Sequence, residues 1–184
     1  MARKGLIFLF FFLTSIVEAE EFDLKKIISL DEPWGSTFIS NDELLITEKK
    51  GKIKLINIIN NNVSEIDHNL KVLNYGQGGL LDIIFHNNSV WASYSEQREN
   101  WKTSTSIAKG SFDKNKIYFK NIFQASPPID SPYHFGSRLV IKDNYLFASV
   151  GERGQGMIAQ DVTKHPGSII RIHLDGSIPK DNPK

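Results

Sequence analysis

The feature that most constrains the fold of this chain is a turn that recurs between short apolar segments. The turns are residues 40–42 (SND), 86–88 (HNN) and 142–144 (KDN), and each separates one apolar segment from a second. Asn and Asp favour such turns because they tolerate left-handed backbone angles and bond their own backbone. A chain divided in this way is expected to form β-hairpins.

The rest of the sequence agrees with an all-β fold. Beyond residue 19 no convincing amphipathic helix pattern occurs, whereas short apolar or alternating runs bounded by Gly, Asn, Asp and Pro are frequent. This pattern is typical of β-strands. The predicted strands cover residues 35–39, 43–47, 52–58, 80–86, 89–95, 103–111, 116–123, 137–141, 145–150 and 168–173.

Similar hairpin motifs begin near Trp34, Leu80 and Arg138. Their spacing of roughly 45 to 60 residues is close to the length of a four-stranded propeller blade. The predicted fold is therefore a β-propeller, with a β-sandwich as the alternative. Residues 20–184 suffice for only about three to four blades, and propellers typically close with four to eight. We therefore expect an incomplete propeller, either a truncated product or a fragment.

The first residues have the pattern of a signal peptide. Arg3 and Lys4 precede an apolar run that extends to Val17, and small side chains at Val17 and Ala19 fit a cleavage site. The run is short for a transmembrane helix, which needs roughly 20 residues. The sequence thus predicts a signal peptide at residues 1–19, a mature domain at residues 20–184, a periplasmic or secreted location, and no stable membrane insertion after cleavage.

The composition excludes several classes of function. Without residues 1–19 the chain carries no net charge, and it contains no cysteine. An uncharged exported chain is a poor candidate for binding nucleic acid. The absence of cysteine excludes a disulfide framework, a thiolate metal site and a thiol nucleophile. Stability must therefore come from a buried core.

His134 is the strongest candidate for a catalytic group. It lies in residues 133–140 (YHFGSRLV), at the entrance of a predicted strand. A histidine held there by a rigid sheet can titrate near neutral pH and act as a general base, and a structural loop histidine is the alternative. Glu152 follows the next predicted strand, and neighbouring antiparallel strands start and end at the same sheet edge. The two side chains can therefore meet, and the carboxylate would orient the ring and raise its basicity; a solvated turn is the alternative for Glu152 and Arg153.

Gln77 is a second candidate, because residues 75–82 (YGQGGLLD) place its amide among glycines before a buried strand. Glycines let the backbone approach a ligand closely, although on spacing alone such glycines more often form a strained turn. Residues 151–156 (GERGQG) superficially suggest a phosphate loop, but no helix is expected after them. We assign Trp34, Trp91 and Trp101 to blade packing, and His68 and His86 to polar turns. No metal-ligand spacing and no GxSxG nucleophile motif occurs, so we predict no metal ligand in this chain.

Taken together, these segments resemble the soluble glucose/sorbosone dehydrogenase family. The matches follow the family's order across nearly all of residues 20–184, and the HFGSR form is closer to the aldose sugar dehydrogenase branch. They are residues 32–35 (EPWG), 45–48 (LITE), 76–82 (GQGGLLD), 94–95 (YS), 134–140 (HFGSRLV), 151–154 (GERG), 167–172 (GSIIRI) and 175–183 (DGSIPKDNP).

The resemblance implies a six-bladed β-propeller that uses pyrroloquinoline quinone (PQQ) and calcium. It implies oxidation of aldose sugars at the anomeric carbon to lactones, with an external electron acceptor. His134 would take the proton of the anomeric hydroxyl while hydride passes to the quinone. Glu152 would support this base, and Gln77 would be a polar contact in the cofactor and substrate cleft.

Two positions depart from the family pattern. Glu152 stands where relatives usually have aspartate, and Tyr133 stands where the glucose-specific enzymes have aspartate. The basic residues and oxygen ligands that bind the quinone and calcium in relatives are expected beyond residue 184. This chain is therefore expected to be inactive alone. A non-catalytic propeller used for binding and a lactonase-type propeller hydrolase are the alternative functions.

Overall fold

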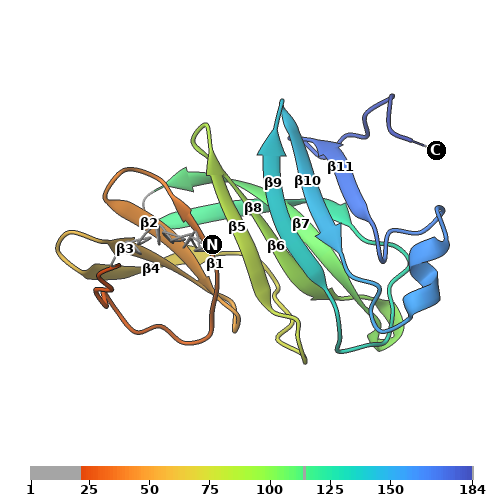
Figure 1. Ribbon diagram of the computed structural model, residues 1–184, viewed down its shortest axis with the longest axis horizontal. Helices are drawn as coiled ribbons and strands as arrows, with labels where there is room; N and C mark the ends of the chain where they lie inside the picture. Colours follow the sequence, from red (N-terminus) through yellow and green to blue (C-terminus); the bar gives the residue numbers. More distant parts are fainter. Residues whose placement is uncertain (1–21, 114, 184) are drawn as a thin grey trace, which may run out of the picture.

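The computed structural model describes residues 22–113 and 115–183, and Figure 1 shows them as β-sheets lying side by side. The predicted signal peptide lies outside these residues. Within them, no helix is long and apolar enough to cross a membrane. The described residues form eleven strands and two short 3-10 helices: β1 (Pro33–Phe38), β2 (Glu43–Glu48), β3 (Lys52–Asn57), β4 (Asn62–His68), β5 (Leu80–His86), β6 (Ser89–Gln97), η1 (Glu99–Trp101), β7 (Thr103–Asp113), β8 (Lys116–Gln124), β9 (Gly136–Lys142), β10 (Tyr145–Val150), η2 (Gly156–Gln160) and β11 (Ile169–His173).

The strands form three antiparallel meanders, as blades of a propeller do. We call β1–β4 blade 1, β5–β8 blade 2 and β9–β11 blade 3. Blades 1 and 2 have four strands each, and the described part of blade 3 has three. The outer strands β4 and β8 are joined by a short parallel ladder at Asp67 with Lys116 and His68 with Ile117. The chain is thus all-β and is part of a β-propeller with about three blades, at the lower end of the expected number.

Two of the three recurring turns are two-residue hairpin loops. Asn87 and Asn88 connect β5 to β6 with φ angles of 46° and 58°, and Asp143 and Asn144 connect β9 to β10 with φ angles of 51° and 63°. Positive φ at both central residues is what a type I′ turn requires, and Asn and Asp tolerate it. In the turn before β2, the Ser40 hydroxyl accepts the backbone N–H of Glu43 instead, at 3.1 Å. The predicted hairpins are confirmed.

The blades pack face to face through two apolar clusters. Successive side chains of a strand point to opposite faces of the sheet. Each sheet face that lies against a neighbouring blade therefore contributes a row of apolar side chains to the cluster between them. The first cluster joins blades 1 and 2, and its fully buried members include Leu45, Ile53, Ile66, Leu80, Ile83, Val90, Ala108 and Ile117. The second joins blades 2 and 3 and contains Trp91, Ile107, Leu139, Leu146, Ala148 and Ile172.

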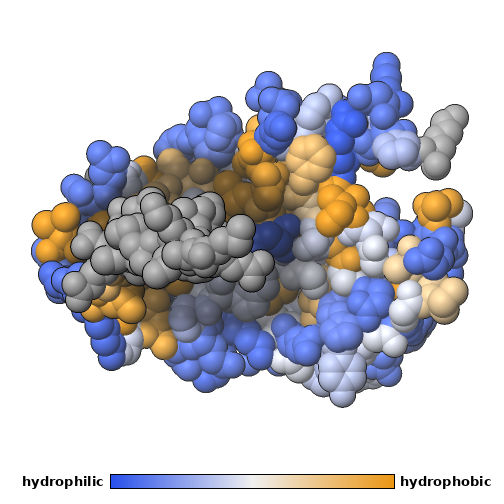
Figure 2. Space-filling model, in the orientation of Figure 1, coloured by the Kyte–Doolittle hydropathy of each residue, from blue (hydrophilic) through white to orange (hydrophobic). Residues whose placement is uncertain are grey.

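The opposite face of blade 3 carries uncovered apolar side chains. Leu139 is buried against blade 2, so its neighbour Val140 faces the other way and is 53% exposed. Ile169 and Met157 are also exposed. Figure 2 shows apolar patches at this end of the molecule, between hydrophilic rims. This face has the character of a sheet surface that packs against another sheet.

Three predictions from the sequence are corrected by the fold. Strand β4 was not expected, because its sequence is polar and only Ile66 is buried; its pairing with β3 maintains the strand. His68, expected in a turn, ends β4, and its ring Nε2 is 2.8 Å from Gly51 O. Trp101 does not pack in a blade, since it is 80% exposed, whereas Trp91 is buried as expected.

Polar side chains fix the inner strands of blades 2 and 3 to each other. The buried carboxylate of Asp82 in β5 accepts the Arg138 guanidinium at 3.0 Å and the Leu139 backbone N–H at 2.8 Å, both from β9. The hydroxyl of Ser93 in β6 donates to Ser137 O at 2.7 Å. Buried charge-assisted bonds of this kind specify geometry strongly. The start of β9, which follows His134, is therefore held in register with blade 2.

Candidate functional site

The candidate residues lie at one edge of the three blades. In a meander, the start of the first strand and the end of the second strand share an edge. Gln77 precedes β5, His134 precedes β9, and Glu152 follows β10. Trp34 in β1 and Lys49 after β2 have the same positions in blade 1. The topology thus brings residues far apart in the sequence to one place.

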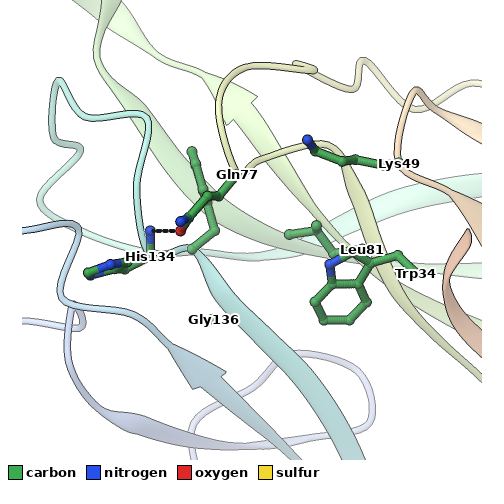
Figure 3. Close-up of a pocket in the computed structure, with 7 residues that line it drawn as sticks. Trp34, Lys49, Gln77, Leu81, His134 and Gly136 are labelled. Carbon is green, nitrogen blue, oxygen red and sulfur yellow. Dashed lines mark hydrogen bonds between the residues drawn. The ribbon is translucent and has the colours of Figure 1, made fainter. Parts of the chain in front are cut away.

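Gln77 and His134 are joined through the backbone. The His134 N–H donates to Gln77 Oε1 at 2.9 Å, and the Gln77 N–H donates to Pro132 O at 2.8 Å. His134 has a φ of 47°, which is uncommon for a residue with a side chain and costs free energy unless the surroundings maintain it. Figure 3 shows Gln77 and His134 on the same side of a cavity, with the bond between them dashed. The glutamine therefore positions the loop that carries the histidine.

His134 and Glu152 are in direct contact, as expected from the strand order. Nδ1 of His134 is hydrogen-bonded to Oε1 of Glu152, which also accepts the Gly154 N–H at 3.0 Å. These bonds lower the pKa of Glu152 below its usual value, chiefly through the histidine. The carboxylate orients the ring by holding Nδ1. The other ring nitrogen, Nε2, is left as the one that can accept a proton, and the imidazole side chain is 52% exposed.

Glycines permit this close approach of the two loops. A Cβ atom on Gly151 would lie 1.9 Å from His134 O, and one on Gly136 would lie 2.6 Å from Gly151 N. Gly136 also has a φ of 71°. Residues with a side chain do not fit at these positions, so the glycines beside His134 and Glu152 are structural requirements of the site.

We expect Gly151→Ala to destabilise the fold by roughly 1–3 kcal/mol, because the added methyl must displace the backbone at His134. The matched control is Gly156→Ala, since nothing lies within 4 Å of the Cβ position there. The midpoints of urea unfolding of the two variants provide the comparison. Equal midpoints for both variants would show that the backbone at residue 134 moves aside without a cost in stability.

Arg153 is a site residue that the sequence did not reveal. A solvated turn was the alternative given for it, but it is only 2% exposed. Its guanidinium donates to Tyr133 O at 2.7 Å, to Thr103 O at 3.1 Å and to Ser131 O, and lies 3.6 Å from the centroid of the Phe135 ring. Burial lowers the pKa of Arg153 to about 10. Arg153 therefore bonds the segment before His134 and packs against Phe135, which follows it.

No local pattern predicted this burial, because Arg153 lies between glycines in a polar segment. Residues 151–156 are followed by the 3-10 helix η2, where no helix was expected. That helix has only five residues, and the loop gives no phosphate site.

The cavity at this edge has a volume of about 390 Å³. Its lining comes from all three blades, and Figure 3 shows Trp34 and Lys49 across it from His134. The lining residues are Trp34, Lys49, Gln77, Leu81, His134, Phe135 and Gly136. Trp34 was expected only to pack within a blade, and no sequence pattern marked Lys49 as a site residue. A mixture of aromatic, amide, imidazole and ammonium groups suits a planar polar ligand.

Metal ligands are not gathered at this edge. Within residues 22–113 and 115–183, no three His, Asp or Glu side chains lie close enough together to hold a metal ion. Calcium prefers six to eight oxygen ligands. The described residues therefore offer calcium no carboxylate cluster.

The three blades share an edge at which a histidine, oriented by a carboxylate, lies beside a cavity. This arrangement is that of a β-propeller protein with a site at the ends of its inner strands. The particular family follows from sequence comparison. The family model described as Glucose / Sorbosone dehydrogenase matches residues 30–184, and the chain belongs to this family.

Similar proteins agree with this assignment. The chain is 34% identical to the aldose sugar dehydrogenase YliI of Escherichia coli K12 over 84% of its length and 44% of the relative's. It is 27% identical to quinoprotein glucose dehydrogenase B of Acinetobacter calcoaceticus, over 90% of the chain and 42% of that protein. The crystal structure of the apo-form of the soluble E. coli aldose sugar dehydrogenase superposes with a TM-score of 0.79, at 33% identity, over 84% of this chain and 47% of that one. The chain thus spans less than half the length of these relatives.

Proposed function

We propose that the protein takes part in the oxidation of aldose sugars at the anomeric carbon, giving lactones, with His134 as the general base. The observation that carries the proposal is the hydrogen bond between His134 Nδ1 and Glu152, which leaves Nε2 as the proton acceptor. The proposal is supported by membership in the glucose/sorbosone dehydrogenase family and by relatives named as sugar dehydrogenases.

The chemistry requires a base because the anomeric hydroxyl must lose its proton as the carbon loses hydride. His134 Nε2 accepts that proton, and the neighbouring carboxylate of Glu152 stabilises the imidazolium that forms. Gln77 holds the backbone N–H of His134 and so positions the loop that carries the ring. Gln77 thus positions the loop, Glu152 orients the ring, and His134 takes the proton.

The proposed cofactor is PQQ, since the A. calcoaceticus relative is named a quinoprotein. When bound, the quinone supplies the hydride acceptor. The cavity of about 390 Å³ fits one side of such a group, because it offers the flat Trp34 ring, the Lys49 ammonium and the Gln77 amide. An external electron acceptor would complete the cycle. Calcium is implied by the family resemblance, and residues 22–113 and 115–183 offer it no cluster of three His, Asp or Glu side chains.

We further propose that the chain is exported by a signal peptide at residues 1–19 and works in the periplasm or outside the cell. Because the chain spans less than half of its relatives, we expect that residues 20–184 alone do not turn over sugar. The described residues supply the base and one side of the cavity, and further blades would complete the site.

The deciding experiment uses the protein expressed from its complete gene. We expect sugar-dependent dye reduction after reconstitution with PQQ and calcium, and none with residues 20–184 alone. Binding of PQQ without reduction by any aldose would contradict the dehydrogenase and favour a propeller used only for binding. Hydrolysis of a lactone without dye reduction would favour a hydrolase.

A further inference from the structure

The cavity beside His134 has an electrostatic character that the general base does not explain. Of its seven lining residues, Lys49 is a cation and none is an acid. Nearby carboxylates are already engaged: Glu152 by His134, Asp82 by Arg138, and Glu32 by Lys49 and Lys50 at 3.8 and 3.7 Å. A cavity with a cation and no acid in its lining favours an anionic ligand. A neutral aldose alone gives no reason for this charge.

Lys49 is held rigidly at the cavity. Its backbone N–H donates to Glu32 O at 3.0 Å, and its carbonyl accepts the Leu80 N–H at 2.9 Å. A Cβ atom on Gly79 would lie 2.6 Å from Lys49 Cγ, so a glycine there makes room for the lysine stem. The turn after β2 is thereby packed onto the same glycine loop that carries Gln77. Figure 3 shows the Lys49 ammonium and the Gln77 amide over the same cavity.

The ammonium of Lys49 retains bonding capacity for a ligand. Among the described residues, the salt bridge that Lys49 makes is to Glu32, and its N–O distance of 3.8 Å is longer than a charge-assisted hydrogen bond. The side chain is nevertheless only 23% exposed. A partly desolvated ammonium with one distant partner gains more from a ligand carboxylate than an exposed lysine does.

We propose that Lys49 binds a carboxylate of the ligand that occupies this cavity, with the Trp34 ring as the flat wall beside it. The inference rests on the proposed function, because the carboxylate belongs either to the quinone or to an acidic sugar. It adds a cation from blade 1 to a set of basic residues that was expected only beyond residue 184. Trp34 has in blade 1 the position that His134 has in blade 3, and Lys49 has the position of Glu152.

The test compares Lys49→Met with Lys50→Met in the complete protein. Lys50 is the matched control, because it lies one residue further along, is 52% exposed and is not part of the cavity lining. Its partners are Asp31 at 2.9 Å and Glu32 at 3.7 Å, so it also controls for the loss of a cation beside Glu32. Isothermal titration calorimetry of the apo-protein with PQQ gives the Kd. We expect Lys49→Met to raise this Kd about 10- to 100-fold, and Lys50→Met to change it less than about twofold. Lys49→Arg should restore most of the affinity, and the Kd of Lys49→Met should depend less on salt.

A second arm identifies the source of the carboxylate. If Lys49→Met leaves the Kd for PQQ unchanged but removes a preference for a uronic acid over the matching aldose, Lys49 binds the substrate's carboxylate. No change in either measurement, or equal changes for Lys49→Met and Lys50→Met, overturns the inference and leaves the proposed function intact. Wild-type protein that binds neither PQQ nor sugar overturns both.

Discussion

Replacing His134 with alanine is expected to lower sugar oxidation by the complete, reconstituted protein by about 10²- to 10⁴-fold, the usual contribution of a general base. The reason is that His134 lines the cavity and its Nε2 is the ring nitrogen left to accept a proton, since Nδ1 is held by Glu152. The affinity for PQQ should remain largely intact, because the backbone of residue 134, which Gln77 holds, is unchanged. The measurement is kcat from dye reduction, together with the Kd for PQQ.

The matched control is His86→Ala. His86 ends β5 at the edge opposite to Gln77, so its removal should leave kcat within about twofold. Glu152→Gln tests the supporting carboxylate: the amide cannot stabilise an imidazolium as a carboxylate does, so kcat should fall. Turnover by His134→Ala equal to that of the wild type would overturn the assignment of the base.

Much of the fold followed from local chemistry in the sequence. Asn87 with Asn88 and Asp143 with Asn144 predicted hairpins because these residue types accept positive φ, and the structure has them in that conformation. The contact of His134 with Glu152 followed from the rule that adjacent antiparallel strands share an edge. Turn chemistry and strand order are local properties, so a single sequence carries them.

Other features could not be predicted because they depend on distant partners. The outer strand β4 shows no apolar alternation, since Ile66 is the buried residue among seven. Its conformation is set by its ladder with β3 and its short pairing with β8. Lys49 lines the cavity only because Gly79, thirty residues away, leaves space for its stem. Such positions have no periodic signal, and only the assembled blades reveal them.

Arg153 is the clearest case of a residue whose role depends on distant partners. Its guanidinium connects the start of β7, at Thr103, with the segment that leads to His134, at Ser131 and Tyr133. The side chain is buried, and its bonds go to carbonyl and hydroxyl oxygens. Arginine suits this position because its planar fork offers five donors in fixed directions. Lysine offers three donors from one atom and cannot reach the same oxygens together.

We therefore expect Arg153→Ala to destabilise the complete protein by about 3–5 kcal/mol, the largest effect on stability among these substitutions. Removal of the guanidinium takes one donor from each of the carbonyl groups of Thr103, Ser131 and Tyr133 and opens a cavity beneath Phe135. Thr103 O keeps the Ile129 N–H and Ser131 O keeps the Thr103 hydroxyl, so the lost packing contributes as much as the lost bonds. Part of this cost is offset because a desolvated cation is no longer buried, as the lowered pKa of about 10 indicates. Urea unfolding followed by tryptophan fluorescence gives the change in midpoint.

Arg153→Lys should recover only part of the lost stability, because one ammonium cannot replace the fork. The matched control is Arg98→Ala, which removes a single 3.3 Å bond to the Ser104 hydroxyl and should cost less than about 1 kcal/mol. If Arg153→Ala unfolds at the same urea concentration as Arg98→Ala, the buried guanidinium does not maintain the loop. If stability falls as expected, the conformation of His134 depends on Arg153, and any residual activity of Arg153→Lys should show a lower kcat with an unchanged Kd for PQQ.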